Sequence, residues 1–435
     1  TGETWTQQTE LSASDGAPGD GFGNSVDISG NYIVVGASGD DNERGDGTGT
    51  AYVFLKGSET WSEQARLVPD DGQNADAFGA AVSIDGDYIA VGAPNDDNAG
   101  GDNAGGVYVF QRNGPGWTQL AKVLASDGVT GDLFGTSLSL QFNTLVAGAP
   151  KEGLLQSGAL YVYGRNGSLW SQEAKLFSSD AEAEEALGSA VALDENYIIA
   201  GAENRAGVQG AAYIFHRIGG QWGSTEERLI TLGDGMGGDR FGGAVAISSQ
   251  FALVGGSGVD GGRGATYLFE RSGNDWLLQT RLNPVDEGGQ DAFGLAVALQ
   301  GENAVIGARN DDNGNGLDAG SAYLISLTGS VSIVSTEEDG FLIQDISLQQ
   351  NYPNPFAGRT TIPFELSEAQ HVTLEIFDVL GRQVAMLVDD YKQAGKHEVT
   401  WTIRHLAGGV YFGRLTTDKA LGTEVIQLIN IDMNN

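Results

Sequence analysis

The stretch FGAAVSIDGDYIAVGAP (residues 78–94) decides the fold, because the chain repeats this pattern six times. Its opening Phe-Gly pair recurs at intervals of 52 to 56 residues, with Leu-Gly as the variant in the fourth copy. The six pairs begin at Phe22, Phe78, Phe134, Leu187, Phe241 and Phe293. A fixed period of this length indicates a repeat architecture in which each copy is one structural unit.

Each copy contains four short runs of β-branched and aromatic residues, separated by Gly, Asn and Asp turns. In order they are the Phe-Gly run, a Gly-Ala run such as YIAVGA, a Tyr run such as VYVF, and a run that begins at a Trp. Such runs predict a four-stranded antiparallel sheet. The Gly-Ala run is apolar on consecutive residues, so neighbouring sheets must cover both of its faces. A ring of such sheets, a β-propeller, satisfies this requirement and protects the strand edges.

The sequence therefore predicts an all-β protein with a six-bladed β-propeller over residues 1–327. The chain begins with the Trp run WTQQTEL, whereas the sixth copy ends at AYLI (322–325) without one. We expect the strand that contains Trp5 to complete the sixth blade and close the ring. The alternative is seven blades, with one missing from the N-terminus or an atypical one formed by residues 331–347.

These repeats resemble the FG-GAP repeats of integrin α-subunit propellers and, more closely, those of bacterial FG-GAP proteins, in which Phe-Gly is followed by Gly-Ala-Pro and then Tyr-Val-Phe. The resemblance covers residues 5 to about 325 and implies a propeller, which has seven blades in integrins. Integrin calcium loops precede the Gly-Ala strand. Here that connection is a short turn such as IDGDYI, so those metal sites do not carry over.

Acidic residues gather in two kinds of connection that emerge on the same face of a four-stranded meander. The connection into each Phe-Gly strand carries an acidic pair. The pairs are Asp15 and Asp20, Asp71 and Asp76, Asp127 and Asp132, Asp180 and Glu185, Asp234 and Asp239, and Asp286 and Asp291. The connections between second and third strands are longest in copies one, two and six, which are neighbours in a closed ring of six. They read GDDNERGDGTG, NDDNAGGDNAG and NDDNGNGLDAG.

The long connections predict a calcium site, because Ca²⁺ prefers six to eight oxygen ligands from carboxylates, amides and backbone carbonyls in a flexible loop. The candidate ligands are Asp40, Asp41, Asp46, Asn95, Asp96, Asp97, Asp102, Asn310, Asp311, Asp312 and Asp318. The alternative is structural, with Asp side chains that hydrogen-bond their own loops as Asx turns and keep the surface soluble.

The opposite face is predicted to carry cations, one just after the third strand in each of five copies. They are Lys56, Arg112, Arg165, Arg217 and Arg271. A disc with one acidic face and one Arg-bearing face could stack head to tail, and a contact of this kind that does not close produces a fibre. A structural subunit of an extracellular filament or surface layer is therefore an alternative function.

Composition excludes several classes of function. The formal net charge of −35, from 58 acidic and 23 basic residues, disfavours nucleic acid and anionic membranes as partners. No cysteine is present, the four histidines are scattered, and no apolar run is long enough to insert into a membrane. No nucleophile elbow, HExxH or phosphate loop appears. Carboxylate pairs for glycoside hydrolysis need a spatial separation that a sequence does not display, so a hydrolase-associated module is a second alternative.

Composition changes after residue 327. Residues 328–347 are predicted to be a linker, and residues 348–435 a small Ig-like β-sandwich built from alternating runs such as HVTLEIFD and GVYFGRLTT. This segment resembles the C-terminal sorting domain of the type IX secretion system. The matching motifs are NYPNPF (351–356), IFDVLGR (376–382), GKH (395–397), Trp401 and GVYF (409–412). The alternative is an ordinary β-sandwich appended for binding.

The resemblance implies export by a Gram-negative bacterium, through contact with the secretion machinery, to the outer-membrane surface or the extracellular space. Together these observations predict a secreted or surface-displayed, non-enzymatic binding or adhesion propeller. Its acidic face would meet a protein or glycan ligand, either directly or through calcium.

Overall fold

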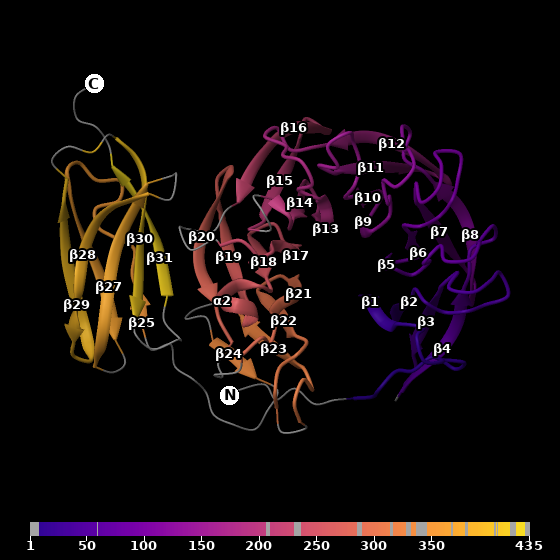
Figure 1. Ribbon diagram of the computed structural model, residues 1–435, viewed down its shortest axis with the longest axis horizontal. Coiled ribbons are helices and arrows are strands. Elements are labelled where there is room, and N and C mark those ends of the chain that lie inside the picture. The colour runs from indigo at the N-terminus through magenta and orange to yellow at the C-terminus, as the bar shows by residue number, and fades with distance from the viewer. Residues whose placement is uncertain are drawn as a thin grey trace. The chain divides into compact units, whose positions relative to one another are not determined.

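The structure is a computed structural model, which describes residues 8–58, 60–205, 209–229, 236–284, 289–313, 316–327, 332–335, 346–366, 369–378, 382–403, 406, 408–417 and 423–430. The chain forms two compact units, Thr1–Arg228 and Leu229–Asn435. Figure 1 shows the strands in groups that follow the chain, from indigo at the N-terminus to yellow at the C-terminus. Among the described residues, no helix is long and apolar enough to span a membrane.

The first unit contains four antiparallel sheets of four strands, one for each of copies one to four, in sequential strand order. In copies one and two the strands are β1 (Phe22–Ser29), β2 (Tyr32–Ala37), β3 (Thr50–Lys56), β4 (Trp61–Leu67), β5 (Ala81–Asp85), β6 (Tyr88–Ala93), β7 (Gly106–Asn113) and β8 (Gly116–Val123). In copies three and four they are β9 (Ser137–Gln141), β10 (Thr144–Ala149), β11 (Ala159–Asn166), β12 (Leu169–Leu176), β13 (Leu187–Asp194), β14 (Tyr197–Ala202), β15 (Ala211–Ile218) and β16 (Gln221–Leu229). The predicted meander is confirmed.

The second unit contains copies five and six. Their elements are β17 (Phe241–Ile247), β18 (Phe251–Gly256), α2 (Val259–Gly262), β19 (Ala265–Ser272), β20 (Asp275–Leu282), β21 (Phe293–Gln300), β22 (Asn303–Ala308), β23 (Ser321–Ser326) and β24 (Ser332–Ser335). The sixth sheet has the order β21-β22-β23-β24. Residues 332–335, which the sequence placed in a linker or a seventh blade, are thus its fourth strand. This corrects the expectation that the Trp5 strand takes that place; Trp5 itself lies outside the described residues.

The second strand of the sheets in copies one to five is buried on both faces, as its consecutive apolar residues predict, whereas β22 of copy six exposes Val305 on one face. In β6, Ile89 and Val91 belong to the core shared with copy one. Ala90, on the other face of the strand, belongs to the core shared with copy three. The Phe of the Phe-Gly pair fills these cores as well. Phe78 is fully buried, and its ring lies edge-on to Tyr108 with a centroid separation of 5.5 Å.

The two glycine positions that recur in the pattern lie against each other across neighbouring copies. A Cβ atom added to Gly92, of the Gly-Ala pair, would lie 2.0 Å from the carbonyl oxygen of Gly135, in the Phe-Gly pair of the next copy. The same approach joins Gly36 to Gly79 and Gly148 to Gly188. Only glycine permits backbones to come this close. The spacing of Phe-Gly and Gly-Ala therefore determines how adjacent sheets are aligned against each other.

Inner strands of consecutive copies are also joined by side-chain oxygens that accept backbone N–H groups. Asp27 accepts from Ile84 N–H (2.8 Å) and from the Ser83 hydroxyl (2.9 Å). Ser83 in turn accepts from Leu140 N–H (3.1 Å), and Ser139 accepts from Leu193 N–H (3.0 Å). These bonds satisfy backbone donors on the free edge of each inner strand. The sequence did not lead us to predict them, although a polar residue (Asp27, Ser83 or Ser139) interrupts the inner apolar run at the same position in copies one to three.

Replacing Ser83 with alanine is expected to lower the free energy of unfolding by about 1–3 kcal/mol, because it leaves the buried Asp27 carboxylate and Leu140 N–H each short of a partner. Ala192 occupies the equivalent position in copy four, so the methyl group fits. Chemical denaturation monitored by tryptophan fluorescence measures the change. A loss below about 0.3 kcal/mol would mean that these bonds contribute no net stability.

The C-terminal region forms a two-sheet sandwich. Its strands are β25 (Ile346–Leu348), β26 (Arg359–Leu366), β27 (Gln370–Asp378), β28 (Gln383–Lys392), β29 (Gly395–Thr402), β30 (Gly409–Thr417) and β31 (Thr423–Asn430). One sheet has the order β25-β26-β29, and the other contains β31-β30-β27-β28. Phe356, Trp401 and Leu415 are among the side chains that form the core between them. The sandwich expected from the alternating runs is confirmed.

Candidate functional site

In copies one, two, three and five, the connection between the second and third strands is hydrogen-bonded to the acidic connection that enters the next copy. In copies one and two, Ala75 N–H donates to Asp46 O (2.9 Å) and Phe78 N–H to Thr48 O (2.8 Å). The same pairing joins Gly131 to Asp102 and, in the second unit, Ala292 to Gly262. The two kinds of connection therefore share one end of each unit, which confirms the expectation. We call this the loop end, and the end with the strand 1–2 turns and strand 3–4 hairpins the hairpin end.

A buried polar network underlies the loop end in copy two. The Tyr108 hydroxyl lies 2.8 Å from both Asp71 Oδ1 and Asp96 Oδ1. Lys122 Nζ lies 2.8 Å from Asp71 Oδ2 and from Asp96 Oδ1, and 4.9 Å from the centre of the Tyr108 ring. Asp96 is fully buried, so its charge depends on these partners. Burial raises the pKa of Asp71, but the bonds from Lys122 and Tyr108 outweigh it and hold that pKa below its usual value.

The network recurs with variations. The Tyr hydroxyl contacts the first acid of the pair in copy one (Tyr52 to Asp15, 2.9 Å) and copy three (Tyr161 to Asp127, 2.8 Å). The cation is Arg66 in copy one and Lys175 in copy three. In copy four, Arg205 from the strand 2–3 connection joins Arg228 on Asp180. Asp234 and Asp286 lie outside the described residues. Sequence analysis missed these Tyr and cationic positions, although a Tyr and a Lys or Arg recur in register.

In copies one to five, the second acid of the pair stabilises its own turn. Its carboxylate accepts a hydrogen bond from the backbone N–H three residues earlier, at 2.7 Å for Asp76 and 2.8 Å for Asp132. Asp20, Glu185 and Asp239 make the same bond. This outcome supports the structural interpretation of these acids. Burial, together with the nearby charges of Asp96 and Asp97, raises the pKa of Asp76 to about 6.

The raised pKa of Asp76 predicts a pH-dependent stability. Because the protonated form is favoured in the folded state, the contribution of Asp76 is fully present below about pH 4 and is lost as the pH rises through about 6. The Asp76→Asn variant has no carboxyl group to ionise at this position. As the pH rises from 4 to 8, its free energy of unfolding should therefore increase by on the order of 1–3 kcal/mol relative to that of the wild type. Urea denaturation at both pH values tests this. Asp70→Asn, an exposed acid of the same connection, is the control; an equal gain there would show that general charge reduction is responsible.

The long connections place the predicted calcium ligands in two environments. Asp40, Asp96 and Asp311 are buried and bond the Tyr of their own copy. Asp41, Asp97 and Asp312 are exposed, and each accepts one backbone N–H six residues later, at 2.7 to 2.8 Å. Asp46, Asp102 and Asp318 are exposed. Asn95 and Asn310 donate to the backbone of Ala75 and Gln290 in the adjacent acidic connection.

These placements decide which residues could hold a cation. In copies one and two, the buried acids already face Arg66 and Lys122, so Asp40 and Asp96 do not fit a calcium site. Among the residues that the structure describes, no three acidic or histidine side chains are grouped to hold a metal ion. The exposed acids keep one or both carboxylate oxygens for an external cation. Four of them belong to copies one and two, in the first unit. Copy six belongs to the other unit, so its place beside them stays a prediction.

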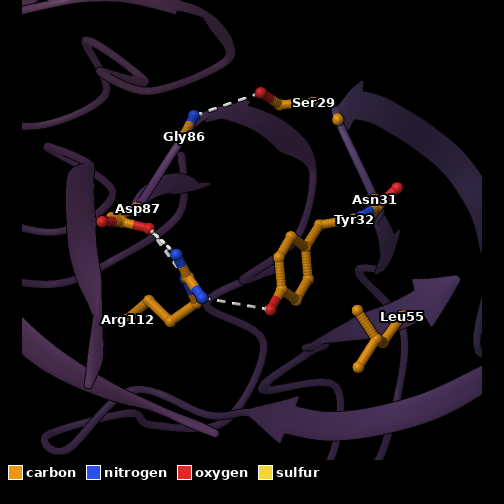
Figure 2. Close-up of a pocket in the computed structure, with 8 residues that line it drawn as sticks. Ser29, Asn31, Tyr32, Leu55, Gly86, Asp87 and Arg112 are labelled. Carbon is orange, nitrogen blue, oxygen red and sulfur yellow. Dashed lines mark hydrogen bonds and ion pairs between the residues drawn. The ribbon is translucent and has the colours of Figure 1, made fainter. Parts of the chain in front are cut away.

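The cations of the hairpin end are engaged locally. Arg112 Nε donates to Asp87 (2.7 Å), and Arg217 pairs with Glu173 at 3.5 Å. Figure 2 shows Arg112 held between Asp87 and Tyr32. Arg165 bonds Asn143 and Tyr88, and Lys56 lies 5.7 Å from the centre of the Trp61 ring. The pairing of Arg112 with Asp87 and of Arg217 with Glu173 reduces the positive charge predicted for the hairpin end. These contacts do not favour head-to-tail stacking over other arrangements.

No curated protein matches the chain. Two solved structures are similar in part. PorZ, a surface component of the type-IX secretion system of Porphyromonas gingivalis, shares 13% identity over 97% of this chain, with a TM-score of 0.43. The chain spans 61% of the length of PorZ. The β-propeller domain of the Trilobed protease from Pyrococcus furiosus shares 9% identity over 79% of this chain and 88% of its own, with a TM-score of 0.38.

Two family profiles match the chain directly. The secretion system C-terminal sorting domain matches residues 350–429, which are the β-sandwich. The protein is therefore exported by type IX secretion, to the cell surface or the extracellular space. The FG-GAP repeat matches residues 5–54, 61–110, 117–163, 170–215, 224–269 and 276–325. From the second match on, each one begins near the Trp run, so it covers the fourth strand of one sheet and the first three strands of the next. Together the matches cover more than half of the chain, which belongs to the FG-GAP repeat family of β-propellers.

Proposed function

We propose that the exported propeller is a non-enzymatic binding module whose loop end contacts a basic partner, such as a cationic protein surface. The observation that carries this proposal is the set of exposed carboxylates on interlocked connections of copies one and two. They are Asp41, Asp46, Asp97 and Asp102. An acidic surface of this kind attracts a cationic partner and raises its rate of association.

Hydrogen bonds within the loops support this role, because they fix the connections before a partner arrives. Asn98 donates to Gly105 O (2.9 Å) and accepts from Gly100 N–H (2.8 Å), while Asp97 accepts from Asn103 N–H (2.8 Å). The same bonds recur around Asn42 in copy one. A loop held in one conformation loses little conformational entropy on binding, so more of the attraction between its exposed charges and the partner remains as binding free energy. This arrangement suits recognition and requires no reacting group.

We further propose that Ca²⁺ can bridge the same exposed acids to a partner, because carboxylate and backbone carbonyl oxygens are its preferred ligands. Asp46 O and Asp102 O already accept hydrogen bonds from the next copy, so the carboxylates are the groups available to the ion. Asp40 and Asp96 have no part in this site.

Isothermal titration calorimetry tests both proposals, with octalysine and CaCl₂ as separate probes. Asp46→Asn, Asp97→Asn and Asp102→Asn together should weaken octalysine binding at least tenfold, and the wild-type affinity should fall as salt is added. The matched control replaces three exposed acids of the hairpin end, Glu195→Gln, Asp275→Asn and Glu302→Gln. Equal losses in both triple variants would show that net charge alone binds the peptide. A wild-type chain that takes up no Ca²⁺ would remove the calcium proposal alone.

A further inference from the structure

A groove lies between copies one and two at the hairpin end, away from the acidic loops. Its volume is about 340 Å³, and it is lined by the strand 1–2 turns of both copies with Leu55 and Arg112. In Figure 2, Tyr32 and Leu55 lie on one side of the groove and Asp87 and Arg112 on the other. A hydrogen bond from Gly86 N–H to Ser29 Oγ (3.1 Å) connects the two turns. The polar side chains of Ser29, Tyr32, Asp87 and Arg112 are therefore each held by a hydrogen bond.

The strand 1–2 turns on both sides of the groove contain glycine, which adds no side chain there. Gly30 and Gly86 have φ angles of 56° and 57°, in the left-handed region that favours glycine, and a Cβ atom added to either would have no atom within 4 Å. In copy three the same turn position is Phe142, with φ 54° and a side chain that is 65% exposed. The backbone thus accepts a large side chain at this position, and copies one and two have none there.

Fastening adjacent copies does not require the open space. Arg112 bonds the Tyr32 hydroxyl (3.3 Å) across the boundary between copies one and two. Arg165 makes the same bond to Tyr88 (3.0 Å) across the next boundary, where Phe142 occupies the turn. The Arg–Tyr contact is therefore found both where the two turns contain glycine and where Phe142 replaces the second glycine. The contact does not depend on glycine in the second turn.

Hydrogen-bond donors and acceptors lie close together in the groove. Arg112 donates twice to Asp87 Oδ1, which leaves Asp87 Oδ2 as an acceptor, and the Asp87 side chain is 53% exposed. The hydroxyls of Tyr32 and Ser29 each accept one bond and keep their hydrogen to donate. Asp87 repels an anion, and Arg112 repels a cation. A neutral ligand with several hydroxyls satisfies both, because each hydroxyl donates and accepts.

We propose that this groove is a binding site for a neutral saccharide. One pyranose ring matches the small volume and can rest its apolar C–H groups on Leu55 and Tyr32 while its hydroxyls bond Asp87 and Arg112. The site is separate from the loop end and does not depend on the proposed contact with a basic partner. It gives the exported propeller a second surface, suited to glycans outside the cell.

Saturation-transfer NMR on the full chain tests the site, with the methyl glycosides of glucose, galactose, mannose and N-acetylglucosamine as probes. At least one should bind saturably, with a dissociation constant on the order of 1 mM, as expected for about twelve heavy atoms of ligand. Glucuronic acid and glucosamine, which carry a charge, should bind more weakly. Gly86→Phe, which copies the side chain of copy three, should weaken binding more than tenfold. Tyr32→Phe, which removes one hydroxyl, should weaken it severalfold.

The matched control is Gly301→Phe. Gly301 has φ 58° and borders a pocket at the equivalent position between copies five and six, whose lining contains neither Tyr nor Arg. This variant should bind as the wild type does, and thermal melting confirms that each variant is folded. Absence of saturable binding by all four glycosides would overturn the proposal. So would equal binding by Gly86→Phe and the wild type, or charged sugars that bind as tightly as neutral ones.

Discussion

Replacing Gly92 with alanine is expected to destabilise the first unit by about 3 kcal/mol or more, or to prevent folding. The new Cβ atom would lie 2.0 Å from the carbonyl oxygen of Gly135, far inside van der Waals contact. Because the obstacle is backbone, no side-chain rotation can relieve it. Two sheets would have to separate, which would also expose the core that they share. Thermal melting of the purified chain measures the loss.

The control for this prediction is Gly116→Ala. Gly116 stands at the start of β8, and the nearest atom to an added Cβ would be Asn113 O, at 3.9 Å. This variant should melt within about 2 °C of the wild type, as surface substitutions usually do. If Gly92→Ala had the same melting temperature as Gly116→Ala, the inference that adjacent sheets approach closely at Gly92 would be wrong.

Replacing Lys122 with methionine is expected to cost about 3–5 kcal/mol, because it removes the cation from a fully buried carboxylate. Lys122 Nζ contacts Asp71 and Asp96, and Asp96 has no exposure to water that could replace the lost charge. Methionine has a similar volume, so the loss reflects charge and hydrogen bonding and not a cavity. Chemical denaturation measures it.

Lys151→Met provides the comparison, since Lys151 is exposed on the connection after β10. Its effect should stay within about 0.5 kcal/mol. The double variant Lys122→Met with Asp96→Asn should recover part of the loss, since the orphaned charge is then absent. Failure to recover any stability would show that Lys122 acts through packing and not through its charge.

Much of the fold could be predicted because its signals are local and repeated. The apolar run of β6 indicates burial on both faces, and the structure places Ile89 and Ala90 in different cores. The alternating runs after residue 348 predict the sandwich that the structure contains. The fourth strand of the sixth sheet could not be predicted in the same way. Residues 332–335 lack the Trp pattern, and strand pairing at an edge depends on which segment lies nearest.

The candidate site was harder to predict, because its contacts join residues far apart in the chain. Tyr52 bonds Asp15, which lies 37 positions away, and no local pattern shows that the two meet. Asp40 and Asp41 look alike in the sequence, yet one is buried beside Arg66 and the other is exposed. Both residues follow the end of β2 at Ala37, and their difference follows from their partners: Asp40 bonds Thr50 and Tyr52 of β3, whereas Asp41 bonds Gly47 N–H within the loop. The sequence predicted an acidic end but could not separate its structural acids from its exposed ones.

Hydrogen–deuterium exchange of the full chain, with and without saturating octalysine, tests most directly whether the interlocked acidic connections are the contact surface. Exchange should slow in residues 41–47 and 97–103 and stay unchanged in the hairpin-end turns at residues 30–32 and 86–88. Protection at those turns, or equal protection at both ends of the unit, would contradict it.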